Sequence, residues 1–244
     1  MLRAAYREFL EEFNSDLLDM CDRVTGIMSH ASKALLEQSL DDAEEALTST
    51  DSLTEIRQRC EDRAMRLLAL QNPVASELRQ VISSIYIVEN LNRMGALAKN
   101  VALLARQRHP ASVYPEALHG YVAELARLVD EMGSIVRALL MDPDPDVAVD
   151  LHTVDEGVDD MKAYLSTLVT DREWEYTTRQ AVDLAMLTRY YERYADRCVA
   201  AAGRVVFLVT GQTPEDYLRQ RDKANYEPDL KFAEIERRFR AQQQ

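Results

Sequence analysis

Residues 28–36 read MSHASKALL, and residues 132–140 read MGSIVRALL. Both stretches carry a methionine, an alanine and two leucines at the same relative positions. Each lies inside a longer run in which apolar side chains recur every three or four residues, the period of one face of an α-helix. The first run consists of Tyr6, Phe9, Phe13, Leu17, Met20, Val24, Ile27, Ala31 and Ala34. The second consists of Leu118, Tyr121, Val122, Leu125, Leu128, Met132, Ile135, Val136 and Leu139.

The likeness between the two halves extends beyond these runs. Asp51 corresponds to Asp155 at the same offset, and after a small gap Arg93 corresponds to Arg193. A repeat of this size, built only from helical patterns, is typical of duplicated helical bundles. We therefore predict an all-α fold of two tandem three-helix bundles related by internal duplication.

Breaks in the apolar pattern predict where helices end. Asn72-Pro73 and Asp142–Pro145 interrupt it, because a residue before proline disfavours the helical conformation. The second helix of the first half is expected to bend near Ser49–Ser52. The last long helix should run from about Glu175 to Val209, with Gly211 as its C-cap.

These breaks divide the chain into three parts. We predict a first bundle over residues 1–109, a second over residues 110–212, and a C-terminal extension over residues 213–244. Residues 217–244 contain seven Lys or Arg against five Asp or Glu, so this tail is slightly basic. It should either fold back on the acidic body or reach a partner. Its apolar side chains are Leu230, Phe232, Ile235 and Phe239.

Composition excludes several functional classes. The formal net charge is −13, which should repel nucleic acid. The N-terminus lacks a secretory signal, no window of about 18 uncharged apolar residues occurs, and the three cysteines lack zinc-ribbon spacing. We therefore expect a cytoplasmic protein. The nucleophile-elbow, Walker A and dinucleotide-binding motifs are absent, so we predict that it is not an enzyme.

Four carboxylates in the second half are the sharpest candidate site. Asp155 and Asp159 share one helix face, and Glu192 and Asp196 share a face of the next long helix. Like charges four residues apart destabilise a helix unless something compensates them. Oxygen ligands from adjacent helices could hold an iron, zinc or magnesium ion.

A salt-bridge network is the alternative interpretation of these acids. Arg189 and Arg193 each lie three residues before Glu192 or Asp196, a spacing that also favours ion pairs. The first half has fewer carboxylates at the corresponding positions. Asp51 and Glu55 correspond to Asp155 and Asp159, but Asn92 and Ala96 stand where the second half has Glu192 and Asp196. A metal site is therefore expected in the second half, with Asp51 and Glu55 as a remnant.

Three stretches form recognisable motifs. Residues 189–196 read RYYERYAD, residues 204–211 read RVVFLVTG, and residues 70–79 read LQNPVASELR. The first two resemble the closing signature of the PhoU family of phosphate-uptake regulators, and the third resembles a first-half motif of the same family. The chain departs from the family pattern at Arg197, where a histidine is usual, and at Ala200, where an asparagine is usual.

The resemblance implies two three-helix bundles whose acidic motifs can hold metal clusters. Carried over by position, the second motif falls on Asp155, Asp159, Glu192 and Asp196, and the first on Asp51 and Glu55. It also implies a negative regulator of phosphate uptake and phosphate-starvation signalling. Its partners would be the ATPase subunit of the phosphate ABC transporter and a sensor histidine kinase, with membrane association only through them, and we also expect a homodimer.

Two other functions stay open from the sequence. One is a metal-dependent carboxylate protein, either an oxidase or an ion store. The other is a diverged paralogue that serves a different client.

Overall fold

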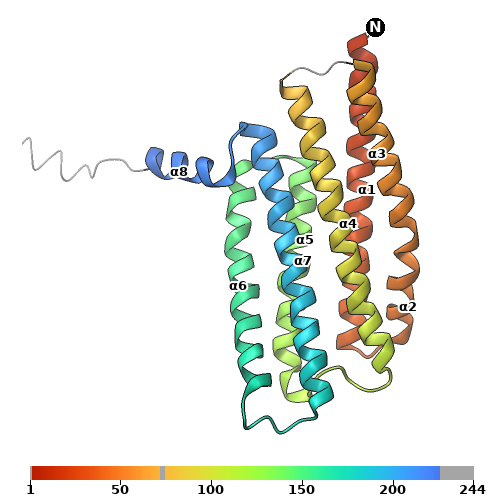
Figure 1. Cartoon of the computed structure of the whole chain (residues 1–244), viewed down its shortest axis with the longest axis vertical. Helices are drawn as coiled ribbons and strands as arrows, with labels where there is room; N and C mark the ends of the chain where they lie inside the picture. The colour runs from red at the N-terminus through yellow and green to blue at the C-terminus, as the bar shows by residue number, and fades with distance from the viewer. Residues whose placement is uncertain (1, 72–74, 226–244) are drawn as a thin grey trace, which may run out of the picture.

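The computed structural model describes residues 2–71 and 75–225, and in these ranges the chain forms helices and no strand. The fold is all-α, as predicted (Figure 1). In chain order the helices are α1 (Leu2–Leu36), α2 (Leu40–Ser49), α3 (Asp51–Gln71), α4 (Ser76–Arg108), the short 3₁₀ helix η1 (Glu116–Leu118), α5 (His119–Met141), α6 (Pro145–Thr170), α7 (Thr178–Thr210) and α8 (Pro214–Asn225).

The helices form two bundles that lie side by side. In the first, α1 packs against α4 and against α2 and α3, which together take the place of one helix. In the second, α5, α6 and α7 pack against one another. α1 and α5 bury most of the apolar stripes that the sequence predicted, including Phe13, Val24 and Met132, but Tyr121 of the second stripe is exposed.

The bend expected near Ser49–Ser52 is a complete break. Thr50 separates α2 from α3, and its hydroxyl donates a hydrogen bond of 2.7 Å to the carbonyl of Leu47. A threonine that bonds to the preceding turn competes with the helical ladder. The corresponding helix of the second bundle, α6, runs through without a break.

The helix ends of the second half are set by local capping. α7 begins at Thr178, three residues after the position expected from the apolar pattern. Thr177 is the reason, because it forms a capping box with Gln180. Gly211 closes α7 with φ of 76°, so the predicted left-handed C-cap is confirmed. Asn72 and Pro73, where the sequence predicted a break, lie outside the described residues.

One hydrophobic core runs through both bundles. α4 lies along α7, and α1 lies along α5, so the bundles meet over most of their length. Polar interactions also cross this contact. The hydroxyl groups of Ser32 and Tyr191 form a hydrogen bond of 2.9 Å. Arg108 donates two hydrogen bonds, of 2.5 and 2.8 Å, to the buried carboxylate of Asp183. The two bundles are therefore joined by packing and by a bidentate ion pair.

The described part of the C-terminal extension contacts α6 near its start, and α8 then extends away from the bundles (Figure 1). α8 follows α7 directly, and the Tyr217 hydroxyl donates to Asp146 of α6 at 2.9 Å. Arg221 donates to Asp150 at 2.9 Å. Leu230, Phe232, Ile235 and Phe239, which the sequence analysis singled out in the tail, lie outside the described residues. No helix in the described ranges is both long and apolar enough to span a membrane.

Candidate functional site

The four acids of the second half lie at the contact between α6 and α7. Asp155 and Asp159 are on α6, and Glu192 and Asp196 are on α7. The side chains of Asp155 and Glu192 are only 13% and 12% exposed, whereas that of Asp196 is 38% exposed. Asp155 and Glu192 are therefore largely sheltered from solvent, whereas Asp159 and Asp196 are accessible to it.

Burial and mutual repulsion both act on the pKa values of these acids. The pKa of Asp155 is raised to about 6, chiefly by burial and then by the negative charges of Asp159, Asp196 and Glu192. Burial and the neighbouring charge of Glu192 also raise the pKa of Asp196. Acids of both helices therefore act on Asp155, and a four-carboxylate site at this contact stays a prediction.

Cationic side chains already neutralise part of this cluster. Lys162 Nζ lies 3.0 Å from a Glu192 oxygen, and Arg189 lies 3.3 Å from the same carboxylate. Arg193 lies 3.5 Å from Asp196. Both ion pairs predicted at a spacing of three residues therefore form, and Lys162 of α6 adds a third that the motif did not indicate.

The arrangement as folded does not fit a metal ion. Within residues 2–71 and 75–225, no three Asp, Glu, His or Cys side chains are placed to hold one ion together. A cation at Glu192 would compete with Lys162 and Arg189 for the same oxygens. Metal binding by Asp155, Asp159, Glu192 and Asp196 stays a prediction.

The corresponding face of the first bundle carries no such cluster. Asp51 and Glu55 are exposed near the start of α3. On α4 the corresponding positions are Asn92, which is half-buried, and Ala96, which is exposed. The structure therefore agrees with the sequence in leaving this face with two acids.

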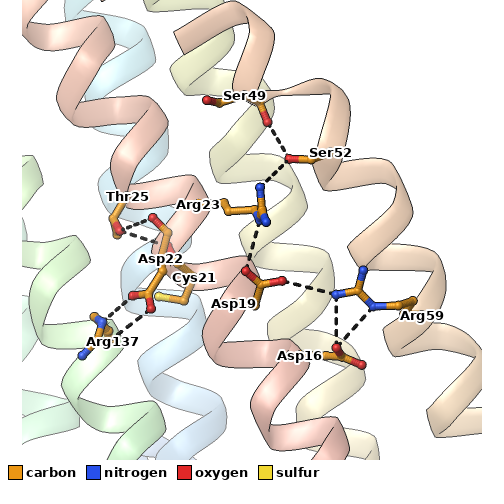
Figure 2. A network of polar contacts seen from close by, with 10 residues as sticks. All are labelled: Asp16, Asp19, Cys21, Asp22, Arg23, Thr25, Ser49, Ser52, Arg59 and Arg137. Atoms are coloured by element: carbon orange, nitrogen blue, oxygen red, sulfur yellow. Dashed lines mark hydrogen bonds and ion pairs between the residues drawn. The ribbon is translucent and has the colours of Figure 1, made fainter. Parts of the chain in front are cut away.

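The first bundle instead interleaves acids with arginines between α1 and α3 (Figure 2). Arg59 of α3 donates to Asp16 and to Asp19 of α1, each at 3.2 Å. Arg23 bridges Asp19 at 3.1 Å and the Ser52 hydroxyl at 3.1 Å. Here Asp16 and Asp19 each contact an arginine and share Arg59 between them, so no excess of negative charge builds up.

Sequence reasoning missed a groove beside the acidic cluster. It has a volume of about 940 Å³ and is bounded by α4, α6, α7 and the start of α8. Arg197 and Ala200, the two positions that depart from the family pattern, both line it. Arg93, Arg197 and Arg204 are the sequence signal that could have indicated a basic surface there, but nothing in the sequence indicates that α4 lies opposite α7.

A family model described as the PhoU domain matches residues 17–105 and residues 122–205. The chain belongs to the PhoU family. The first matched range lies within α1 to α4 and the second within α5 to α7, so the two PhoU domains coincide with the two bundles. The resemblance drawn from the three sequence motifs is confirmed.

Relatives cover most of the chain. A Mycobacterium tuberculosis protein named phosphate-specific transport system accessory protein PhoU homolog 2 is 40% identical over 213 residues, which is 87% of this chain and 100% of the relative. A Mycobacterium leprae protein named homolog 1 is 40% identical over 215 residues, 88% of this chain and 97% of the relative. The crystal structure of PhoU from Pseudomonas aeruginosa matches the fold with a TM-score of 0.77 at 24% identity, over 85% of this chain and 100% of that one.

Proposed function

We propose that this PhoU-family protein is a regulatory adaptor that restrains phosphate uptake and phosphate-starvation signalling. The observation that carries the proposal is the 40% identity to proteins named as accessory to phosphate-specific transport. Its partners would be the ATPase subunit of a phosphate ABC transporter and a sensor histidine kinase. It would work in the cytoplasm, reach the membrane only through these partners, and perform no catalysis of its own.

An adaptor of this kind acts by binding one state of its partner more tightly than another. The equilibrium of the partner then shifts by the difference in binding free energy. The continuous core and the Arg108–Asp183 pair support this role, because they hold the two bundles together. A preorganised helical surface loses less conformational entropy when it binds a partner. A homodimer would present that surface twice, and sedimentation of the full chain tests its formation.

A deletion strain grown in abundant phosphate tests the proposal. We expect phosphate-starvation genes to be expressed there, and a plasmid copy to restore repression. Mycobacterium tuberculosis has relatives named homolog 1 and homolog 2, so any second copy in the test organism must also be deleted. Normal repression in the strain that lacks both copies would rule the adaptor out and favour a paralogue with another client.

A metal-binding carboxylate protein is the second candidate function. It is favoured by the acids of both helices that act on Asp155, whose pKa is raised to about 6 by burial and then by these neighbouring charges. Elemental analysis of protein purified without a metal-chelating tag separates the two candidates. Stoichiometric redox metal would support an oxidase or an ion store, and metal far below one equivalent would support the adaptor.

A further inference from the structure

The groove beside the acidic cluster combines an apolar lining with a basic one. Its apolar side chains come from all four surrounding helices and include Tyr86, Val149, Val199, Ala200, Phe207 and Leu218. Arg93 of α4 and Arg197 and Arg204 of α7 also line it. Glu89 and Glu215 are its acids, so the groove is net positive on a chain whose formal net charge is −13.

Two of the three arginines keep their hydrogen-bonding capacity. Arg93 is paired with Glu89 at 2.8 Å. Arg204 lies over the ring of Tyr86, 4.1 Å from its centroid, a contact that leaves the N–H groups at the guanidinium edge available. Arg197 makes no hydrogen bond or ion pair with any side chain in the described ranges. Arg197 and Arg204 are seven residues apart, so both project from the same face of α7.

The volume of the groove is large enough for a short helical segment. A helix is about 10 Å across and rises about 1.5 Å per residue, so a groove of this volume holds roughly eight residues, or two turns. Helices that dock in grooves bury apolar side chains at positions i, i+3, i+4 and i+7. Carboxylates on the flanks of such a helix would meet Arg197 and Arg204 in bidentate geometry.

We propose that this groove docks one amphipathic helix of a partner protein, with apolar side chains on its buried face and Asp or Glu on its flanks. This inference rests on the proposed adaptor function and adds to it the docking surface and the chemistry of the partner. The tail of this chain suits the groove less well. Residues 226–244 contain four acidic and four basic residues, so they bring no net negative charge to the arginines.

A designed peptide tests the groove directly. The probe is a fluorescein-labelled, stapled helix of about 14 residues, with leucines on one face and glutamates on both flanks. A matched peptide carries glutamines in place of the glutamates. We expect the full-length protein to bind the acidic peptide about tenfold more tightly than the glutamine peptide in fluorescence anisotropy. Equal affinity for the two peptides would overturn the proposal.

Variants then locate the binding. The double variant Arg197→Glu/Arg204→Glu should weaken binding at least about tenfold, and Ala200→Trp should do the same by filling the groove without changing the charge. The charge-matched control is Arg172→Glu/Arg179→Glu, at exposed positions near the other end of α7, and it should bind like the wild type. Wild-type affinity in both groove variants, with circular dichroism showing folded protein, would overturn the proposal.

Two further measurements test the other occupants. Tighter peptide binding after deletion of residues 226–244 would show that the tail fills the groove, and a dimer that dissociates in Arg197→Glu/Arg204→Glu would show that a second copy does. Either result overturns the partner-helix proposal. The deletion strain separates the groove proposal from the adaptor function. If repression is lost on deletion but restored by plasmid copies of both groove variants, the groove proposal alone is refuted. If deletion leaves repression unaffected, the adaptor function is refuted.

Discussion

The two bundles share a backbone plan but distribute their charges differently. In the second, four carboxylates lie where α6 meets α7, and the ion pairs with Lys162, Arg189 and Arg193 fall on Glu192 and Asp196. In the first, the acids of α1 lie opposite arginines of α3, and Arg59 pairs with both Asp16 and Asp19. The two copies therefore share their helix packing but differ in where their acidic and basic side chains lie.

The contrast shows most clearly in two carboxyl groups. Asp155 of the second bundle has its pKa raised to about 6, first by burial and then by neighbouring acids. Asp42 of the first has its pKa lowered to about 2, chiefly by its hydrogen bonds with Ser39 and His30. The ionised form of Asp155 is destabilised in the folded protein, and the ionised form of Asp42 is stabilised. The contributions of these two residues to the free energy of unfolding should therefore change with pH in opposite directions.

The largest effect is expected from cavities in the two cores. Ile56 on α3 and Leu165 on α6 are both buried, and neither helix packs against the other bundle. Ile56→Ala and Leu165→Ala should each lower the free energy of unfolding by about 3 kcal/mol. Because the core is continuous, both variants should shift a single denaturation transition, measured by circular dichroism in urea. Two transitions, of which each variant moves only one, would show that the bundles unfold independently.

A smaller effect with a distinct pH profile is expected for Asp155→Asn. The folded-state pKa of Asp155 is about 6 and its ordinary value is 3.8. Between about pH 4 and about pH 6 the folded protein therefore binds more protons at this residue than the unfolded chain does. The wild type should therefore lose stability as the pH rises from about 4 to about 6. The variant should be more stable by about 1 kcal/mol above pH 6, after allowing for solvent screening, and the gain should vanish near pH 4. Urea midpoints measured across this range check it, and a constant difference would contradict it.

Asp42→Asn should have the opposite sign. Its pKa is lowered from 3.8 to about 2, so its stabilising contribution is present above pH 4 and lost as the pH falls toward 2. The variant should be less stable than the wild type by about 0.5 kcal/mol at pH 7, because the carboxylate is close to the surface. The difference should shrink below pH 4. Thermal melts at pH 7, 4 and 3 give the comparison, and an unchanged melting temperature at pH 7 would argue against a stabilised carboxylate.

The smallest expected effect concerns metal content, where we predict an asymmetry between the halves. Any cation carried by the purified protein should depend on Asp155 and Glu192, so Asp155→Asn/Glu192→Gln should lower the metal measured by mass spectrometry. The matched variant Asp51→Asn/Glu55→Gln should leave it unchanged. Because Lys162 and Arg189 already contact Glu192, we expect less than one equivalent in the wild type. Metal lost only in the first-half variant would reverse the assignment.

The sequence alone determined the helices, the duplication and the family. Apolar periodicity reports which face of a helix is buried, and caps such as Gly211 are set by backbone conformation within one turn, so both are local properties. The position of α7's first residue was missed by three residues because the apolar pattern does not mark the capping box at Thr177. The spacing of Glu192 and Asp196 likewise predicted their ion pairs with Arg189 and Arg193.

The tertiary structure decided which faces meet. Lys162 of α6 pairs with Glu192 of α7, and Arg59 of α3 pairs with two acids of α1. Arg108 of the first bundle pairs with Asp183 of the second. The groove exists because α4, α6 and α8 surround one face of α7. Periodicity fixes the side of a helix that is buried but carries no information about its neighbour, and electrostatic interactions depend on that neighbour within a few ångströms.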